Sequence, residues 1–171
     1  CVSPGGRGRA RVVLWEPAGA GNGHNDPKVG KGTPADDGPT WRAPVLVNDV
    51  ATTNSQFLPY VALDPTSGTV AVGFHDCRND NGIPGSGGTN MIPNDDAEYY
   101  GTFTIDGGAT WAPNRRLSGG CSNATASGNG IHSGHHVGIH ARTGEHDTLR
   151  SDNATHAGPN PKRTAQTLQL L

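Results

Sequence analysis

Hydrophobic, aromatic and charged residues are all scarce in this chain of 171 residues. They make up 32%, 5% and 16% of the sequence. No apolar run approaches the roughly 20 residues that a membrane helix needs, so we predict no membrane span. The formal net charge of −2 provides no basic surface, and we therefore expect no nucleic-acid partner. The length suits a single domain over residues 1–171.

Cysteine is scarce as well. Three cysteines allow at most one internal disulfide, and Cys77 and Cys121 are the candidate pair. Sequence spacing does not fix disulfide geometry, so a bond and two free thiols both stay open. The residues from Cys1 onward show no signal-peptide pattern. We expect Cys1 to be either the lipid-modified cysteine of a processed lipoprotein or the first residue of a mature or trimmed fragment. Asn123-Ala124-Thr125 matches the N-glycosylation triplet, which is common by chance.

Turn-forming residues, in contrast, are abundant. The chain has 26 glycines and 13 prolines, which favours short strands joined by turns over helices. We therefore predict an all-β fold. The expected strands span residues 9–16, 41–48, 57–63, 69–75, 97–105 and 111–117, with weaker ones at 135–141, 145–152 and 163–171. We expect loops at 17–38 and 76–96.

One motif occurs twice. Residues 104–111 read TIDGGATW and residues 34–41 read PADDGPTW, so both contain Asp-x-Gly-x-Thr-Trp. An aspartate can accept hydrogen bonds from the backbone N–H groups of its own turn, and glycine adopts conformations that other residues resist. The threonine would begin the next strand, and the tryptophan would pack the hairpin onto the sheet. The motif predicts a tight hairpin at Asp36 and at Asp106.

The motif resembles the Asp-box, or BNR repeat, of secreted bacterial sialidase-like β-propellers. The resemblance continues through FLPYVALDPTSGTVAVGFHDCRND, NDDAEYYGTFTIDGGATWAPNRRLS and SNATASGNGI, and covers about residues 41–131. It implies a six-bladed β-propeller with four antiparallel strands in each blade. This chain would supply about three blades, and the best-formed one spans residues 55–120. Three blades cannot close a ring, so we expect either a homodimer or the missing remainder of a longer propeller.

The resemblance also implies a carbohydrate-directed function at a secreted or cell-surface location. In a sialidase-like exo-glycosidase, arginines hold the substrate carboxylate, a glutamate activates a tyrosine nucleophile, and an aspartate is the acid/base. The candidates here are Arg78, Asp76, and Glu98 with Tyr100, which share one face of a strand. In the alternative arrangement Tyr100 is a core residue and Glu98 lies at the rim. A non-catalytic glycan-binding or structural propeller is therefore the second hypothesis.

The loop at 76–96 is rich in oxygen ligands. Asp76, Asp80, Asp95 and Asp96 could bind Ca²⁺, which prefers carboxylate and carbonyl oxygens. Two alternatives need no metal: Arg78 could pair with the carboxylates, or the loop could be a solvated turn region. A second cluster consists of histidines where relatives have acidic and aromatic residues, and it favours surface histidines over a zinc site. Its members are His132, His135, His136 and His140.

Overall fold

The computed structural model describes residues 45–50, 53–85 and 87–123 with their side chains, and the backbone of further strands on either side of this central part. The described residues form eleven strands and no helix. They include no helix that is long and apolar enough to cross a membrane. The prediction of an all-β fold is confirmed for this part of the chain.

The strands form three antiparallel sheets. The first contains β1 (Arg11–Pro17), β2 (Asn25–Lys31) and β3 (Val45–Leu46). The central sheet contains β4 (Gln56–Leu63), β5 (Val70–Asp76), β6 (Asp96–Thr104), β7 (Arg115–Arg116) and β8 (Ser122–Asn123). The third contains β9 (Gly138–Arg142), β10 (Glu145–Asp152) and β11 (Lys162–Gln169).

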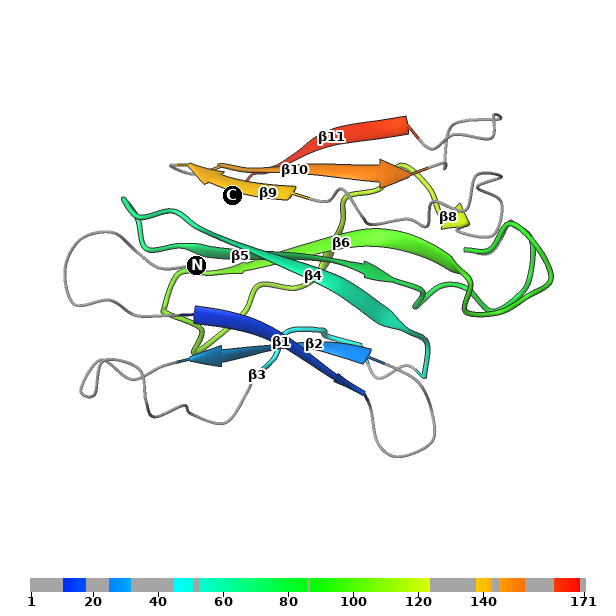
Figure 1. Ribbon diagram of the computed structural model, residues 1–171, viewed down its shortest axis with the longest axis horizontal. Coiled ribbons are helices and arrows are strands. Elements are labelled where there is room, and N and C mark those ends of the chain that lie inside the picture. The colour runs from blue at the N-terminus through cyan, green and yellow to red at the C-terminus, as the bar shows by residue number, and fades with distance from the viewer. Residues whose placement is uncertain are drawn as a thin grey trace.

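The central sheet lies between the other two (Figure 1). Its first strand, β4, contacts β1 and β2 in one neighbouring sheet and β9 in the other. The described strands stay open and do not close into a ring. A complete propeller is therefore a proposal, whereas the succession of antiparallel sheets is observed.

Two predictions of secondary structure were wrong. The segment 17–38 was expected to be a loop, but it contains β2, which pairs along its whole length with β1. Asn25 and Pro27 are residue types that are uncommon in strands, but pairing with a neighbouring strand outweighs this propensity. The strand expected at 111–117 is reduced to Arg115–Arg116. The N–H of Ala112 still bonds to the carbonyl of Phe103, but Pro113 has no N–H and interrupts the pairing.

The core is built on both faces of β5, whose seven residues are all buried. On one face Val72 and Phe74 pack with Val47 and Tyr100. On the other face the His75 ring stacks on Phe57 and meets the edge of Tyr99. A strand that is covered on both faces reads as a continuous apolar run, and β5 fits this pattern from Val70 to Phe74 before it ends in His75 and Asp76. The core therefore fixes the end of β5, where the candidate site begins.

The hairpin turn predicted at Asp106 is confirmed. The Asp106 carboxylate accepts bonds from the N–H groups of Ala109 (2.9 Å) and Thr110 (3.0 Å) and from the Thr110 hydroxyl (2.6 Å). Gly107 and Gly108 have φ values of 75° and 89°, which disfavour residues with a Cβ. Trp111 packs against the core, as expected. The matching segment 34–41 lies outside the described residues.

Candidate functional site

An open pocket of about 610 Å³ lies where β5 ends and β6 begins. Residues between 78 and 88 from the segment that joins these strands form one wall of the pocket, and residues after the Asp106 hairpin form another. The lining side chains are mostly polar, and four glycines expose backbone. The lining residues are Arg78, Asn79, Asn81, Gly85, Gly87, Gly88, Glu98, Arg116, Gly120 and Cys121.

Glu98 is the central acidic group of the pocket. It is paired with Asp76 across β5 and β6, and it is almost fully buried. One carboxylate oxygen accepts a bond from Arg116 Nη1 at 2.7 Å. The other accepts bonds from the Tyr100 hydroxyl at 3.1 Å and from Asn79 Nδ2 at 2.5 Å. The two-residue period of β6 predicted that Glu98 and Tyr100 share a face, and the structure confirms it.

Tyr100 lies beneath the pocket and does not line it. Its ring packs with the core, and the Arg78 guanidinium carbon stands 4.1 Å from the ring centre. Burial raises the pKa of the Tyr100 hydroxyl, and the negative charge of Glu98 raises it further. The neutral phenol is therefore favoured, and Tyr100 could act as a nucleophile only if Glu98 takes its proton.

Arg78 joins three segments of the chain. Its Nε and Nη2 atoms each lie 2.7 Å from Asp76 Oδ2, and its Nη1 lies 2.9 Å from Asp49 Oδ1. Its Nη2 also donates to the side-chain oxygens of Asn48 and Asn114. Burial lowers the pKa of Arg78, but the bonds to Asp76 and Asp49 and their charges raise it overall. All three guanidinium nitrogens are thus engaged by the protein, and the side chain is only 10% exposed.

Asp76 is completely buried beneath Arg78. Its carboxylate accepts bonds from the Arg78 backbone N–H at 2.6 Å and from Gln56 Nε2 at 3.2 Å, besides those from the guanidinium. Burial raises the pKa of Asp76, although Arg78 opposes this shift. Asp76 was predicted as a calcium ligand, but the metal-compatible group found among the described residues does not include it. Asp76 instead pairs with Arg78, two positions along the chain.

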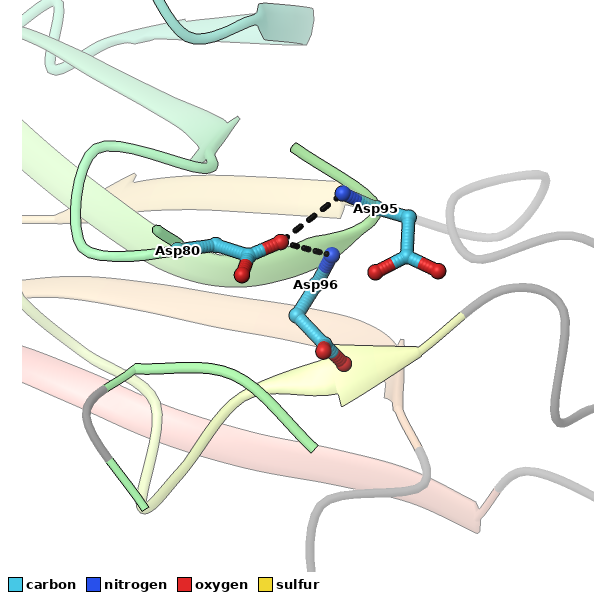
Figure 2. A group of neighbouring side chains, drawn as sticks. All are labelled: Asp80, Asp95 and Asp96. Atoms are coloured by element: carbon cyan, nitrogen blue, oxygen red, sulfur yellow. Dashed lines mark hydrogen bonds between the residues drawn. The ribbon is translucent and has the colours of Figure 1, made fainter. Parts of the chain in front are cut away.

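The other three predicted ligands do come together. Asp80, Asp95 and Asp96 each offer a carboxylate oxygen within 4.8 Å of the others. Figure 2 shows that Asp80 Oδ2 accepts the backbone N–H groups of Asp95 (2.8 Å) and Asp96 (2.9 Å). Within the described residues, Asp95 Oδ1 is buried without a hydrogen-bond partner. An oxygen in this state fits a cation, so these three residues could hold a metal ion.

Neighbouring polar residues hold this acidic group in place. The backbone N–H and hydroxyl of Thr89 donate to the Asp96 carboxylate at 2.6 and 2.8 Å. Asn123, on β8, is buried and donates its amide to Asp95 and to the Thr89 hydroxyl, both at 3.2 Å. These bonds fasten the two limbs of the long loop to each other and to the sheet.

Both described cysteines are free thiols, so Cys77 and Cys121 form no disulfide. Burial raises the pKa of the Cys77 thiol, and the charge of Asp76 adds to this shift. The pKa of the Cys121 thiol is also raised, mainly by burial. The predicted histidine cluster falls outside the described residues, except for the backbone of His140 in β9.

The sequence did not single out several residues that shape the site. Asn79 and Arg116 bind Glu98, and Asp49, Asn48 and Asn114 bind Arg78. One signal was available for Arg116. It follows the predicted hairpin and belongs to the strand paired with Tyr100. The partners of Arg78 lie 29 to 36 residues away along the chain and carried no such signal.

No protein-family model matches the chain, and a comparison with curated proteins found no match. One similar solved structure is titled "Hadza microbial sialidase Hz136". It is 16% identical, with a TM-score of 0.47 over 84% of this chain. The chain spans 28% of the length of that structure. A similarity at this identity and TM-score does not assign a function to this chain.

Proposed function

We propose that this chain binds a carbohydrate in the pocket beside Glu98 and Arg116. The observation that carries the proposal is the convergence of a carboxylate, two guanidinium groups and two amides on one open pocket. These groups provide donors and acceptors that match the hydroxyl groups of a sugar. The glycines of the lining let a ligand approach the backbone closely. The sequence resemblance to sialidase-like proteins supports the same class of ligand.

Arg116 is the residue we expect to contact the ligand most directly. Its side chain is 52% exposed, and the bond to Glu98 uses only Nη1. The Glu98 bond raises the pKa of Arg116, so the charge is maintained. The remaining guanidinium donors can bond to a sugar hydroxyl or, in bidentate fashion, to a sugar carboxylate. Arg116 therefore fits the binding role that the sequence assigned to Arg78.

A sialidase-like exo-glycosidase is the second candidate. The hydrogen bond from Tyr100 to Glu98 favours it, because a glutamate that accepts the tyrosine proton creates a nucleophile. Asp76 would be the acid/base and Arg78 the substrate clamp. Asp76 is buried away from a ligand in the pocket, and Arg78, although it lines the pocket, has its guanidinium nitrogens bonded to protein groups. The geometry therefore supports binding more directly than hydrolysis.

The proposal includes a Ca²⁺ ion held by Asp80, Asp95 and Asp96. Three carboxylates within a few ångströms repel one another unless positive charge offsets them. Asp80 also accepts three backbone N–H bonds, two from Asp95 and Asp96 and one from Gly82. When bound, the cation would supply neutralising charge and fix the long loop beside the pocket. We further propose a secreted or cell-surface location, which suits a protein that meets extracellular glycans.

A glycan array run beside a fluorogenic sialoside assay tests the function. We expect glycan binding that Arg116→Ala abolishes and Arg115→Ala preserves. Arg115 is an exposed neighbour on the same strand, so it controls for the general loss of a positive charge. Turnover of the sialoside that is lost in Tyr100→Phe and Glu98→Gln would favour the enzyme. Absence of both binding and turnover would contradict the carbohydrate-directed function.

A further inference from the structure

The wall of the pocket formed by the long loop carries an exposed apolar surface. The side chains of Ile83, Met91 and Ile92 are 57%, 83% and 57% exposed. They are three of the six large hydrophobic residues that are exposed among the described residues, and all three lie on this loop. Exposed apolar side chains on a loop that also lines a polar pocket can contact a ligand held in that pocket.

The three residues belong to the same folded unit as the pocket. Ile83 lies between Asn81 and Gly85, which both line the pocket. The Ile83 carbonyl oxygen is 3.5 Å from where a Cβ on Gly88, another lining residue, would lie. A Cβ on Gly82 would lie 3.3 Å from the Met91 carbonyl oxygen. The backbone of Met91 therefore passes next to the limb that carries Ile83.

Hydrogen bonds fasten the loop at two places. The Gly85 N–H donates to the Gly88 carbonyl at 3.0 Å, which closes the tip of the loop. At its base the loop is fastened by the bonds of Asp80 to the backbone of Asp95 and Asp96. Ile83, Met91 and Ile92 therefore form an apolar ledge on a loop that these bonds fasten beside the pocket.

We propose that the ligand is an amphipathic glycoconjugate, with its sugar in the pocket and an apolar aglycone lying on Ile83, Met91 and Ile92. This inference rests on the proposed carbohydrate function and names the class of molecule that carries the sugar. The polar pocket provides hydrogen bonds for the sugar, and the apolar ledge removes hydrocarbon of the aglycone from water. The affinity should therefore increase with the area of hydrocarbon that the aglycone buries on the ledge.

Matched pairs of methyl and octyl glycosides test the inference. The sugars are galactose, N-acetylglucosamine and N-acetylneuraminic acid, and titration calorimetry measures Kd. For the sugar that binds, we expect the octyl glycoside to bind about tenfold more tightly than the methyl glycoside. Ile83→Ser and Met91→Ser should each reduce this difference and leave Kd for the methyl glycoside unchanged. Ile105→Ser is the matched control, because Ile105 is exposed beyond the opposite end of β6.

The possible outcomes separate the two proposals. If no glycoside binds, the carbohydrate function and this inference both fail. If methyl and octyl glycosides bind equally, or if the octyl gain survives Ile83→Ser and Met91→Ser, only this inference is overturned. Sedimentation with phosphatidylcholine vesicles completes the test. If the protein binds sugar-free vesicles and Met91→Ser loses this binding, the ledge contacts a membrane surface. The proposal that it contacts an aglycone is then overturned.

Discussion

Arg78 and its partners show how single residues connect distant segments of the chain. The guanidinium holds Asp76 at the end of β5, Asp49 in the segment after β3, and Asn114 just before β7. It also covers the ring of Tyr100. Because these contacts come from four segments, Arg78 contributes to the fold whatever the ligand is.

We predict that Arg78→Ala destabilises the protein by about 3 kcal/mol, because it leaves the buried carboxylate of Asp76 without its cation. Arg78→Lys should lose less, since an ammonium keeps the charge but cannot reproduce the planar set of bonds. Urea denaturation measures both. Arg115→Ala, the exposed control, should stay within about 0.5 kcal/mol of the parent protein. Equal stability of Arg78→Ala and the parent would contradict this account.

We also predict that the pKa of the Tyr100 hydroxyl depends on the charge of Glu98. Its pKa is raised first by burial and then by the charge of Glu98. Glu98→Gln removes the charge and leaves the burial, so the Tyr100 pKa should fall but stay above its ordinary value of 10.0. Ultraviolet difference absorbance across alkaline pH follows the ionisation, and Tyr100→Phe identifies the Tyr100 component. A Tyr100 pKa that is unchanged in Glu98→Gln would show that Glu98 has no effect on it.

At the scale of single elements, the Asp106 hairpin and the Asp64 turn are both stabilised by hydrogen bonds to an aspartate. Asp64 accepts bonds from the Thr66 N–H and the Ser67 hydroxyl, and Gly68 follows with a φ of 75°. In both turns an aspartate receives donors from the next few residues. These bonds are local, and this is why the Asp106 turn could be predicted from the sequence.

The Asp106 turn should make stability depend on acid. Bonds from the Thr110 hydroxyl and N–H lower the pKa of Asp106 well below its ordinary value of 3.8. The folded pKa is therefore below the unfolded one, so the contribution is fully present above about pH 4 and is lost as the pH falls through the folded pKa. The stability difference between the parent protein and Asp106→Ala should shrink below pH 4. Urea denaturation at a series of pH values measures it, and a difference independent of pH would be inconsistent with ionised Asp106 as the acceptor.

The strands and the site were predictable to different degrees. The strands β4, β5 and β6 match the expected segments to within one residue at each end, because their apolar pattern is local. The strand β2 was missed because only its pairing with β1 reveals it. In the site, alternation along β6 placed Glu98 and Tyr100 together. No local pattern showed that Asp76 would be buried under Arg78, because their other partners come from distant segments.

At the scale of the whole molecule, the long loop and the open sheet edges are the features that a cation or another chain could bind. The loop is closed at its base because Asp80 accepts the Asp95 N–H and the Thr89 N–H donates to Asp96. The three sheets follow one another without closing a ring among the described strands (Figure 1). A bound cation could therefore change the order of the loop, and a second chain could pair with an open sheet edge.

We predict that calcium raises the melting temperature. A cation that binds only the folded state adds about 2.7 kcal/mol when its free concentration is about 100 times Kd. Differential scanning calorimetry with calcium, and then with a chelator, measures the effect. Asp95→Asn should weaken the calcium response, because it alters the carboxylate with the unpartnered oxygen. A melting temperature that does not change at millimolar calcium would remove the metal from the proposal.

We also predict that the isolated chain associates with itself. Unpaired N–H and C=O groups at open sheet edges favour pairing with another chain. Light scattering coupled to size-exclusion chromatography should give a mass of at least twice 17.7 kDa. A monodisperse monomer with well-dispersed backbone resonances would argue against both a homodimer and a dependence on further blades.

The position of Asn123 has a consequence for how the protein can be produced. Its amide nitrogen is the atom to which an N-linked sugar would be attached, and here that nitrogen bonds to Asp95 and the Thr89 hydroxyl inside the fold. A glycan added there during synthesis in a eukaryotic secretory pathway would occupy the place of both bonds and keep β8 away from β6. In such a host, folding of the loop and sugar transfer would compete for one atom. A bacterial host without this modification avoids the competition.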